Sequence, residues 1–163
     1  MRTVELAQLN IGRAVAPLDD PRMDGFVTRL AEINALAERS PGYVWRLTDV
    51  LGADATGVRA YDDPLVIVNL TVWAGIDQLF DFAYRSTHVD LLRARRSWFV
   101  PLDGPTLVLW WVRAGVRPTI EEAVARLDHL ATNGPSAHAF TMKFRFGPDW
   151  ASLDRELAVG SPA

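Results

Sequence analysis

The sequence predicts an α+β domain in which an antiparallel sheet is covered by helices on one face. Three observations support this class. Residues 3–12 alternate with the period of a strand, and residues 21–37 and 75–96 carry apolar stripes at helical spacing. Residues 65–73 and 106–113 are apolar on both faces, as expected of buried strands. At 163 residues and 49% hydrophobic content, the chain is long enough for one core.

The N-terminal half predicts three strands and one helix. Strand 3–12 places the amides of Gln8 and Asn10 on one face. Asp20 followed by Pro21 provides an N-cap and a proline at the first helical position, and the helix is expected to end near residues 40–42. After it, the β-forming residues at 42–48 and 65–73 predict two strands, joined by a loop over 49–63.

The C-terminal half begins with a helix over 75–96, either continuous or broken near Ser86, and continues with a strand over 106–113. A capping box then predicts a helix over 119–132, and alternating apolar residues predict a final strand over 138–146.

The predicted domain covers residues 1–147, and a tail over 148–163 follows it. Trp150, Leu153 and Leu157 have the spacing of one face of a short helix, so we expect the tail to dock on the body.

The predicted order β-α-β-β-α-β, with an appended helix and strand, matches the ferredoxin-like plan. In this plan the two helices cover one face of the sheet. Because the strands at 65–73 and 106–113 are apolar on the other face too, that face is expected to be buried by a second copy. The sequence therefore predicts a homodimer, a dimeric α/β barrel.

Composition excludes several classes of function. The chain has no cysteine, which excludes disulfides, a thiol nucleophile and cysteine-ligated metals. Its net charge is −3 and Lys143 is its one lysine, so a nucleic-acid-binding surface is not expected. Residues 1–5 do not begin a secretory signal and no apolar run spans a bilayer, so we expect a cytoplasmic protein without a membrane partner.

Tyr84, His88 and Arg95 are the candidate catalytic residues. At about 100° per residue, they fall within roughly 40° of one another on a continuous helix, beside its apolar stripe. A phenol, an imidazole and a guanidinium there would supply a proton relay and an anion clamp. The alternative is a structural row at the boundary of the core.

The candidate ligand-binding residues are Gln8, Asn10, Asn69, Trp98 and Trp110. Amides in the centre of strands need a hydrogen-bond partner or a ligand, and indole rings wall many ligand pockets. The alternatives are cross-strand pairing of the amides and tryptophans that simply fill the core. No metal site is expected, because the three histidines are scattered; haem with His88 as its axial ligand is a further alternative.

Three segments carry a family resemblance: Tyr84–Phe99, Leu6–Asn10 and Leu109–Val112. They resemble the domain of unknown function 3291 family, within the dimeric α/β-barrel superfamily. That superfamily includes cofactor-independent monooxygenases of antibiotic biosynthesis, haem-degrading monooxygenases, lactone isomerases and polyketide cyclases.

The resemblance implies a cofactor-independent enzyme of monooxygenase-like or isomerase/cyclase-like type, acting on an aromatic or polyketide-like substrate. His88 would be its acid–base group and Arg95 would orient a carbonyl or carboxylate. The alternative function is a non-catalytic dimeric protein that binds a small hydrophobic ligand or has a stress-related role.

Overall fold

The computed structural model of the chain describes residues 3–49, 52, 54–85, 94 and 96–160. Its elements, in chain order, are β1 (Val4–Ala14), η1 (Pro21–Met23), α1 (Asp24–Arg39), β2 (Tyr43–Arg46), β3 (Val66–Trp73), α2 (Ile76–Arg85), β4 (Phe99–Val100), β5 (Leu107–Arg113), α4 (Ile120–Asn133) and α5 (Trp150–Gly160). Within the described residues, every helix is too short or too polar to span a bilayer.

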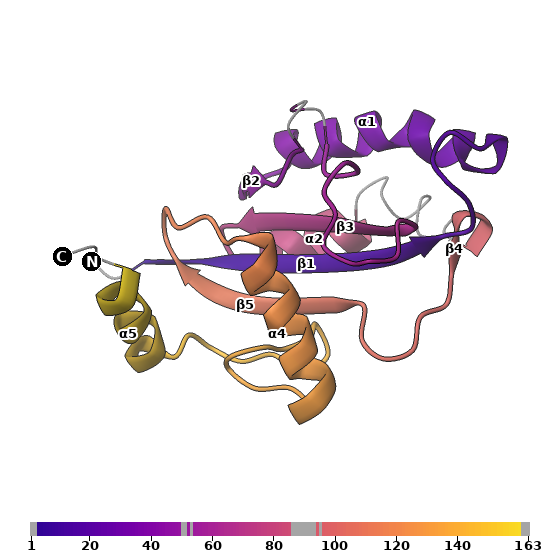
Figure 1. The fold of residues 1–163 in the computed structure, drawn as a ribbon. Coiled ribbons are helices and arrows are strands. Elements are labelled where there is room, and N and C mark those ends of the chain that lie inside the picture. The colour runs from indigo at the N-terminus through magenta and orange to yellow at the C-terminus, as the bar shows by residue number, and fades with distance from the viewer. Residues whose placement is uncertain (1–2, 50–51, 53, 86–93, 95, 161–163) are drawn as a thin grey trace.

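The described strands form a five-stranded antiparallel sheet around β1 (Figure 1). On one side β1 pairs with β3, which pairs in turn with β2; on its other side β1 pairs with both β4 and β5. This sheet and its helices confirm the predicted α+β class. The short strand β4 was not predicted, because two residues are too few to show a periodicity.

Alternation along β1 divides the sheet into two faces. The first face carries Leu6, Gln8 and Asn10, and the register places Trp73, Thr71 and Asn69 of β3 directly opposite them. The second face carries Ala7, Leu9 and Ile11, opposite Val72, Leu70 and Val68.

Helices α1 and α2 lie on the first face of the sheet. Leu6, Trp73 and Leu109 of the sheet pack there against Ala37 of α1 and Leu79 of α2. Phe140, from the segment after α4, completes this cluster and is fully buried.

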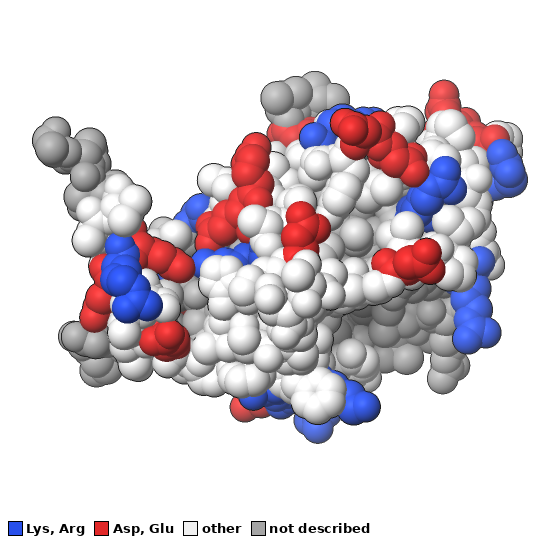
Figure 2. All heavy atoms as spheres, turned by 60° about the horizontal axis from the view of Figure 1, so that its bottom comes forward, with Lys and Arg blue, Asp and Glu red and all other residues white. Residues whose placement is uncertain are grey.

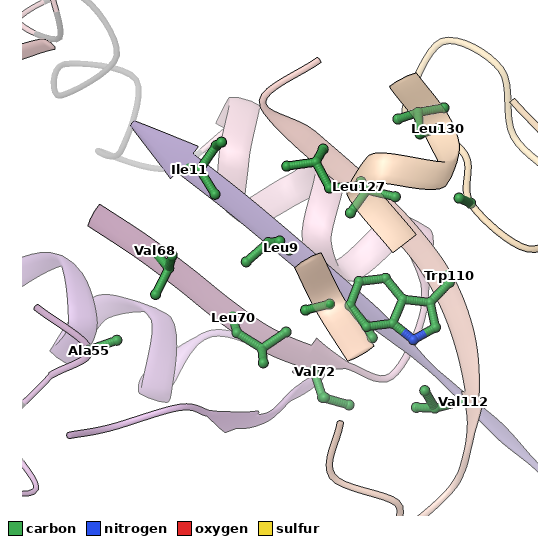
Figure 3. Close-up of a cluster of buried hydrophobic side chains, with 14 of the residues drawn as sticks. Leu9, Ile11, Ala55, Val68, Leu70, Val72, Trp110, Val112, Leu127 and Leu130 are labelled. Carbon is green, nitrogen blue, oxygen red and sulfur yellow. The ribbon is translucent and has the colours of Figure 1, made fainter. Parts of the chain in front are cut away.

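Helix α4 covers the second face, on the side of the sheet away from α1 (Figure 1). Leu127 and Leu130 of α4 pack over Leu9 and Trp110, as Figure 3 shows. The prediction that this face would be open to a second copy is therefore wrong. An apolar strand needs cover on both faces, and here the same chain supplies it; the homodimer that was inferred from an open face stays a prediction.

The prediction of a final strand over 138–146 is also wrong. Of this segment only Phe140 pairs with the sheet, in an isolated bridge to Leu109. Residues 141–145 bond to one another: Thr141 Oγ1 accepts from the Phe144 amide at 3.1 Å, and Arg145 Nε donates to the Met142 carbonyl at 2.9 Å. These local bonds replace the ladder that a strand would form. Phe146 contacts the sheet through its carbonyl, which accepts from the Trp111 side chain at 2.7 Å.

The tail forms α5, which contacts the body through Leu153, through two ion pairs and through Trp150, whose ring centre lies 5.8 Å from the Arg113 guanidinium. Leu153 is 5% exposed, whereas Leu157 is 49% exposed. Asp154 pairs with Arg113 of β5, and Glu156 pairs with Arg126 of α4.

Candidate functional site

A cavity of about 180 Å³ lies between α1 and the first face of the sheet, and it extends to the loop after β2. Its floor is formed by the C-terminal half of β1 and the N-terminal half of β3, and its roof by α1. The described lining residues are Asn10, Ile11, Gly12, Phe26, Leu30, Ile33, Asn34, Arg46, Leu47, Asp54, Ala55, Thr56, Ile67, Val68, Asn69, Trp98 and Phe99.

The cavity exists because α1 does not pack closely on the sheet along its whole length. Of the 16 residues of α1, all of them described, only Ala37 is buried. The apolar residues of its stripe, Phe26, Leu30 and Ile33, are half-buried and line the cavity. An amphipathic helix normally buries this stripe, so the gap beneath α1 leaves apolar surface available to a ligand.

Three aromatic rings close one end of the cavity. Phe26 lies 5.2 Å from Phe99 in an edge-to-face arrangement and 6.0 Å from Trp98, measured between ring centroids. Two glycines permit this packing: a Cβ at Gly12 would lie 2.8 Å from the Phe99 ring, and one at Gly25 would lie 3.0 Å from Trp98. Trp98, which the sequence analysis gave as a ligand-binding residue, lines the cavity, and its role in binding stays a prediction.

The polar part of the lining includes three asparagine amides. Asn10 and Asn69 lie on adjacent strands, and Asn34 lies on α1. Asn69 is exposed although it occupies the centre of a strand, because it faces the cavity. Each amide offers one carbonyl acceptor and two N–H donors, so the site can hydrogen-bond a ligand without carrying a net charge.

Arg46 and Asp54 are the ionisable groups of the described lining, and both have partners within the protein. Arg46 Nε donates to Glu38 at 2.8 Å. Asp54 Oδ1 accepts from the Thr56 amide at 2.8 Å and from the Thr56 hydroxyl at 2.5 Å. In the part of the chain that the structure describes, no cluster of three histidine or acidic side chains could hold a metal ion.

The predicted catalytic row does not appear in the described lining. Tyr84 is 49% exposed and packs against Phe80 on α2, with 4.8 Å between ring centroids. His88 and Arg95 lie outside the described residues.

Two of the predicted ligand-binding residues lie elsewhere. Gln8 is 9% exposed and its Oε1 accepts from the Thr71 hydroxyl at 2.8 Å, which is the cross-strand pairing that the sequence left as an alternative. Trp110 points to the second face and is fully buried under α4 (Figure 3). It is a core residue, because alternation along β5 turns it away from α1.

Sequence analysis did not select Asn34, Phe26 or Phe99 for the site. Asn34 could have been recognised from the sequence, since it is a polar residue within the apolar stripe of residues 21–37. Phe26 could not have been recognised, because an aromatic residue in such a stripe is expected in any core.

A family model described as a domain of unknown function (DUF3291) matches residues 5–155. The chain belongs to the DUF3291 family. The match confirms the resemblance to this family and covers the sheet, the cavity and the start of α5, while the placement in the dimeric α/β-barrel superfamily stays a prediction.

Comparison of this DUF3291 chain with the curated proteins finds no match. Among solved structures it is similar to the NE2512 protein of unknown function from Nitrosomonas europaea. The two share 12% identity with a TM-score of 0.44, and the similarity covers 73% of this chain and 97% of the other.

A second, smaller hollow of about 40 Å³ lies between α4 and α5 of the DUF3291 chain. Arg126, which is 7% exposed, borders it and donates to Glu122 at 3.1 Å, to Glu156 at 3.0 Å and to the His138 carbonyl at 2.9 Å. Its guanidinium also lies 5.7 Å from the centre of the Trp110 ring. Because these charges satisfy one another, we interpret this cluster as a structural joint between the two helices.

The joint makes the stability of the protein depend on pH. Partial burial of the His138 imidazole, and next the charge of Arg126, lower the pKa of His138 below its ordinary value of 6.5. The unfolded chain therefore binds a proton more readily than the folded one, so the free energy of unfolding falls as pH decreases through about 6.5. The effect is at most about 1.4 kcal/mol per pH unit for one proton.

We expect urea unfolding of the wild-type protein to show this loss between about pH 8 and pH 6, where carboxylates stay ionised. His138→Gln keeps an acceptor for Arg126 but does not titrate, so its stability should change less over the same interval. Equal changes in the two proteins would contradict the prediction.

Proposed function

We propose that the protein binds a small molecule in the cavity between α1 and the sheet. The observation that carries the proposal is the gap beneath α1, where a helix with a clear apolar stripe buries only Ala37. Aromatic rings at one end and asparagine amides on the floor give this gap the composition of a ligand site, which is mostly apolar with few polar groups.

The size of the cavity supports a ligand of about one ring. An apolar cavity of about 150 Å³ is enough to hold benzene. The haem alternative stays a prediction, because His88 lies outside the described residues.

The described lining favours binding over catalysis. An enzyme of monooxygenase-like or isomerase/cyclase-like type needs an acid–base group or an anion-stabilising group beside its substrate. Among the described lining residues, Arg46 and Asp54 are the only ionisable groups, and both are engaged by neighbours. We therefore propose the ligand-binding role first, with catalysis by His88 as the alternative.

We further propose that the sheet follows the ferredoxin-like plan. The order β2-β3-β1-β5, with α1 and α2 on the same face, supports it. The homodimer and the cytoplasmic location stay predictions, and no surface is assigned to the dimer. On the face drawn in Figure 2, acidic and basic side chains are interspersed.

A substitution that fills the cavity tests the proposed function. Leu30 lines the cavity, and Val27 lies on the same helix but is 45% exposed. We expect Leu30→Trp to lower the affinity for single-ring aromatic compounds at least about tenfold, because its ring occupies their space, whereas Val27→Trp should not.

Ligand-observed NMR with toluene, phenol, benzamide, benzoate and benzamidine provides the measurement, and thermal melts check that both variants fold. Failure of all five compounds to bind the wild-type protein would contradict the proposed function, as would equal binding by the two variants.

A further inference from the structure

Asn10 and Asn69 form a directly opposed pair on the floor of the cavity. The register of β1 and β3 places them opposite each other, and both line the cavity. In such a pair the two Cβ atoms lie about 4.5–5.5 Å apart. The two amides are therefore close enough to hydrogen-bond the same group of a ligand.

The next polar pair on the same face, Gln8 and Thr71, is satisfied by hydrogen bonds within the protein. There Thr71 donates its hydroxyl hydrogen to Gln8 Oε1 at 2.8 Å, and Trp73 Nε1 donates to Thr71 Oγ1 at 3.0 Å. All the side-chain groups involved are nine-tenths buried or more. Polar side chains on these two strands can thus satisfy one another across the sheet.

The amides of Asn10 and Asn69 are not paired across the sheet in this way. Within the described part of the chain, neither amide forms a side-chain hydrogen bond, either to the other or to a third residue. Both residues line the cavity, where Asn10 is half-buried and Asn69 is exposed, so water or a ligand supplies the hydrogen-bond partners of their amides. Their donors and acceptors are therefore available to whatever fills the space.

The charge of the site restricts that ligand further. Arg46 Nε is paired with Glu38, and Asp54 Oδ1 accepts from the amide and hydroxyl of Thr56, so both charges of the described lining already interact within the protein. A charged ligand would lose hydration and compete with these partners for an ion pair. A neutral ligand with an N–H donor beside a carbonyl acceptor satisfies the two amides at no such cost.

We infer that the ligand is a neutral, planar, single-ring compound that carries a carboxamide or lactam group, recognised through this group by Asn10 and Asn69. The inference rests on the proposed function and names the ligand class for the same cavity. Phe26, Trp98 and Phe99 contact the ring, and the two asparagines set the specificity.

Four probes of nearly equal shape test it: benzamide, benzoate, benzamidine in its cationic form, and toluene. Benzamide offers a hydrogen-bond donor and an acceptor, benzoate offers acceptors only, the benzamidine cation offers donors only, and toluene offers neither. We expect benzamide to bind the wild-type protein at least about tenfold more tightly than each of the others, as measured by NMR titration of the Asn10 and Asn69 side-chain signals.

The variant Asn10→Asp keeps the shape of the side chain and changes its charge. It should weaken the binding of benzamide and strengthen that of benzamidine, and shift the ratio of the two dissociation constants at least about tenfold. Asn133→Asp, at the exposed end of α4, is the control and should leave the ratio unchanged.

The possible results separate the two proposals. Binding of toluene, benzoate or benzamidine as tight as that of benzamide would overturn the inference and leave a ligand-binding cavity of another specificity. An unchanged ratio in Asn10→Asp would overturn it as well. If none of these four probes binds, and phenol does not bind either, the proposed function itself is overturned.

Discussion

Replacement of Arg126 by alanine is expected to reduce the free energy of unfolding by about 2–4 kcal/mol. The Arg126 side chain is 8% exposed, and one guanidinium joins three separate parts of the chain. It donates to Glu122 on its own helix, to Glu156 on α5 and to the backbone carbonyl of His138. Its removal leaves that carbonyl and two acidic groups without their donor.

The loss should stay below that of a fully buried ion pair, because Glu122 and Glu156 are 33% and 48% exposed and regain water. Packing adds to it, since the guanidinium covers the Trp110 ring. Urea unfolding of Arg126→Ala provides the measurement. Arg155→Ala is the matched control on α5: Arg155 is exposed and bonds only Ser152 among the contacts described, so its loss should cost no more than about 0.5 kcal/mol. A similar small cost for both variants would show that the joint between α4 and α5 contributes little.

Local signals in the sequence were enough to place most helices and strands. Asp20 and Pro21 predicted a helix start, and the Asp20 side chain accepts from the Arg22 amide at 2.9 Å as η1 begins. Thr119 predicted another, and its hydroxyl accepts from the Glu122 amide at 3.1 Å at the start of α4. A cap depends on residues two or three positions apart, so it can be recognised without knowledge of the rest of the fold.

The arrangement of the layers could not be obtained in this way. The two-sided apolar pattern of β5 showed that Trp110 needed cover on its face of the sheet, but not which part of the molecule supplies it. A second copy and α4 satisfy that pattern equally well. The structure assigns the cover to Leu127 and Leu130 of α4, a contact that depends on the path of the chain between β5 and that helix.

The candidate site was predictable in part, for the same reason. Asn10 and Asn69 are polar residues within apolar strands, so they were visible as unusual in the sequence itself. The gap between them and Asn34 is a property of how far α1 stands from the sheet, and helical periodicity carries no information on that distance. The Gln8–Thr71 bond was equally hidden, since it joins residues 63 positions apart.

Phe140→Ala should produce a loss of stability of about 3–5 kcal/mol, the range for deleting a buried aromatic ring. Phe140 is fully buried in the cluster with Leu6, Trp73 and Leu109, and its amide and carbonyl bond those of Leu109 at 2.9 and 2.8 Å. For a chain of this length the change corresponds to a fall in melting temperature of roughly 10 °C. Calorimetry of the purified variant measures it.

Phe144→Ala is the matched control, because it removes the same ring four residues later, where the side chain is 55% exposed. Its expected cost is within about 0.5 kcal/mol. A strand over 138–146 would place Phe140 and Phe144 on the same face and bury both, so the two substitutions would then cost similar amounts. In the structure the backbone pairing of the segment with the sheet ends at Phe140, and Phe144 is exposed, so a large difference between the two variants is the expected result.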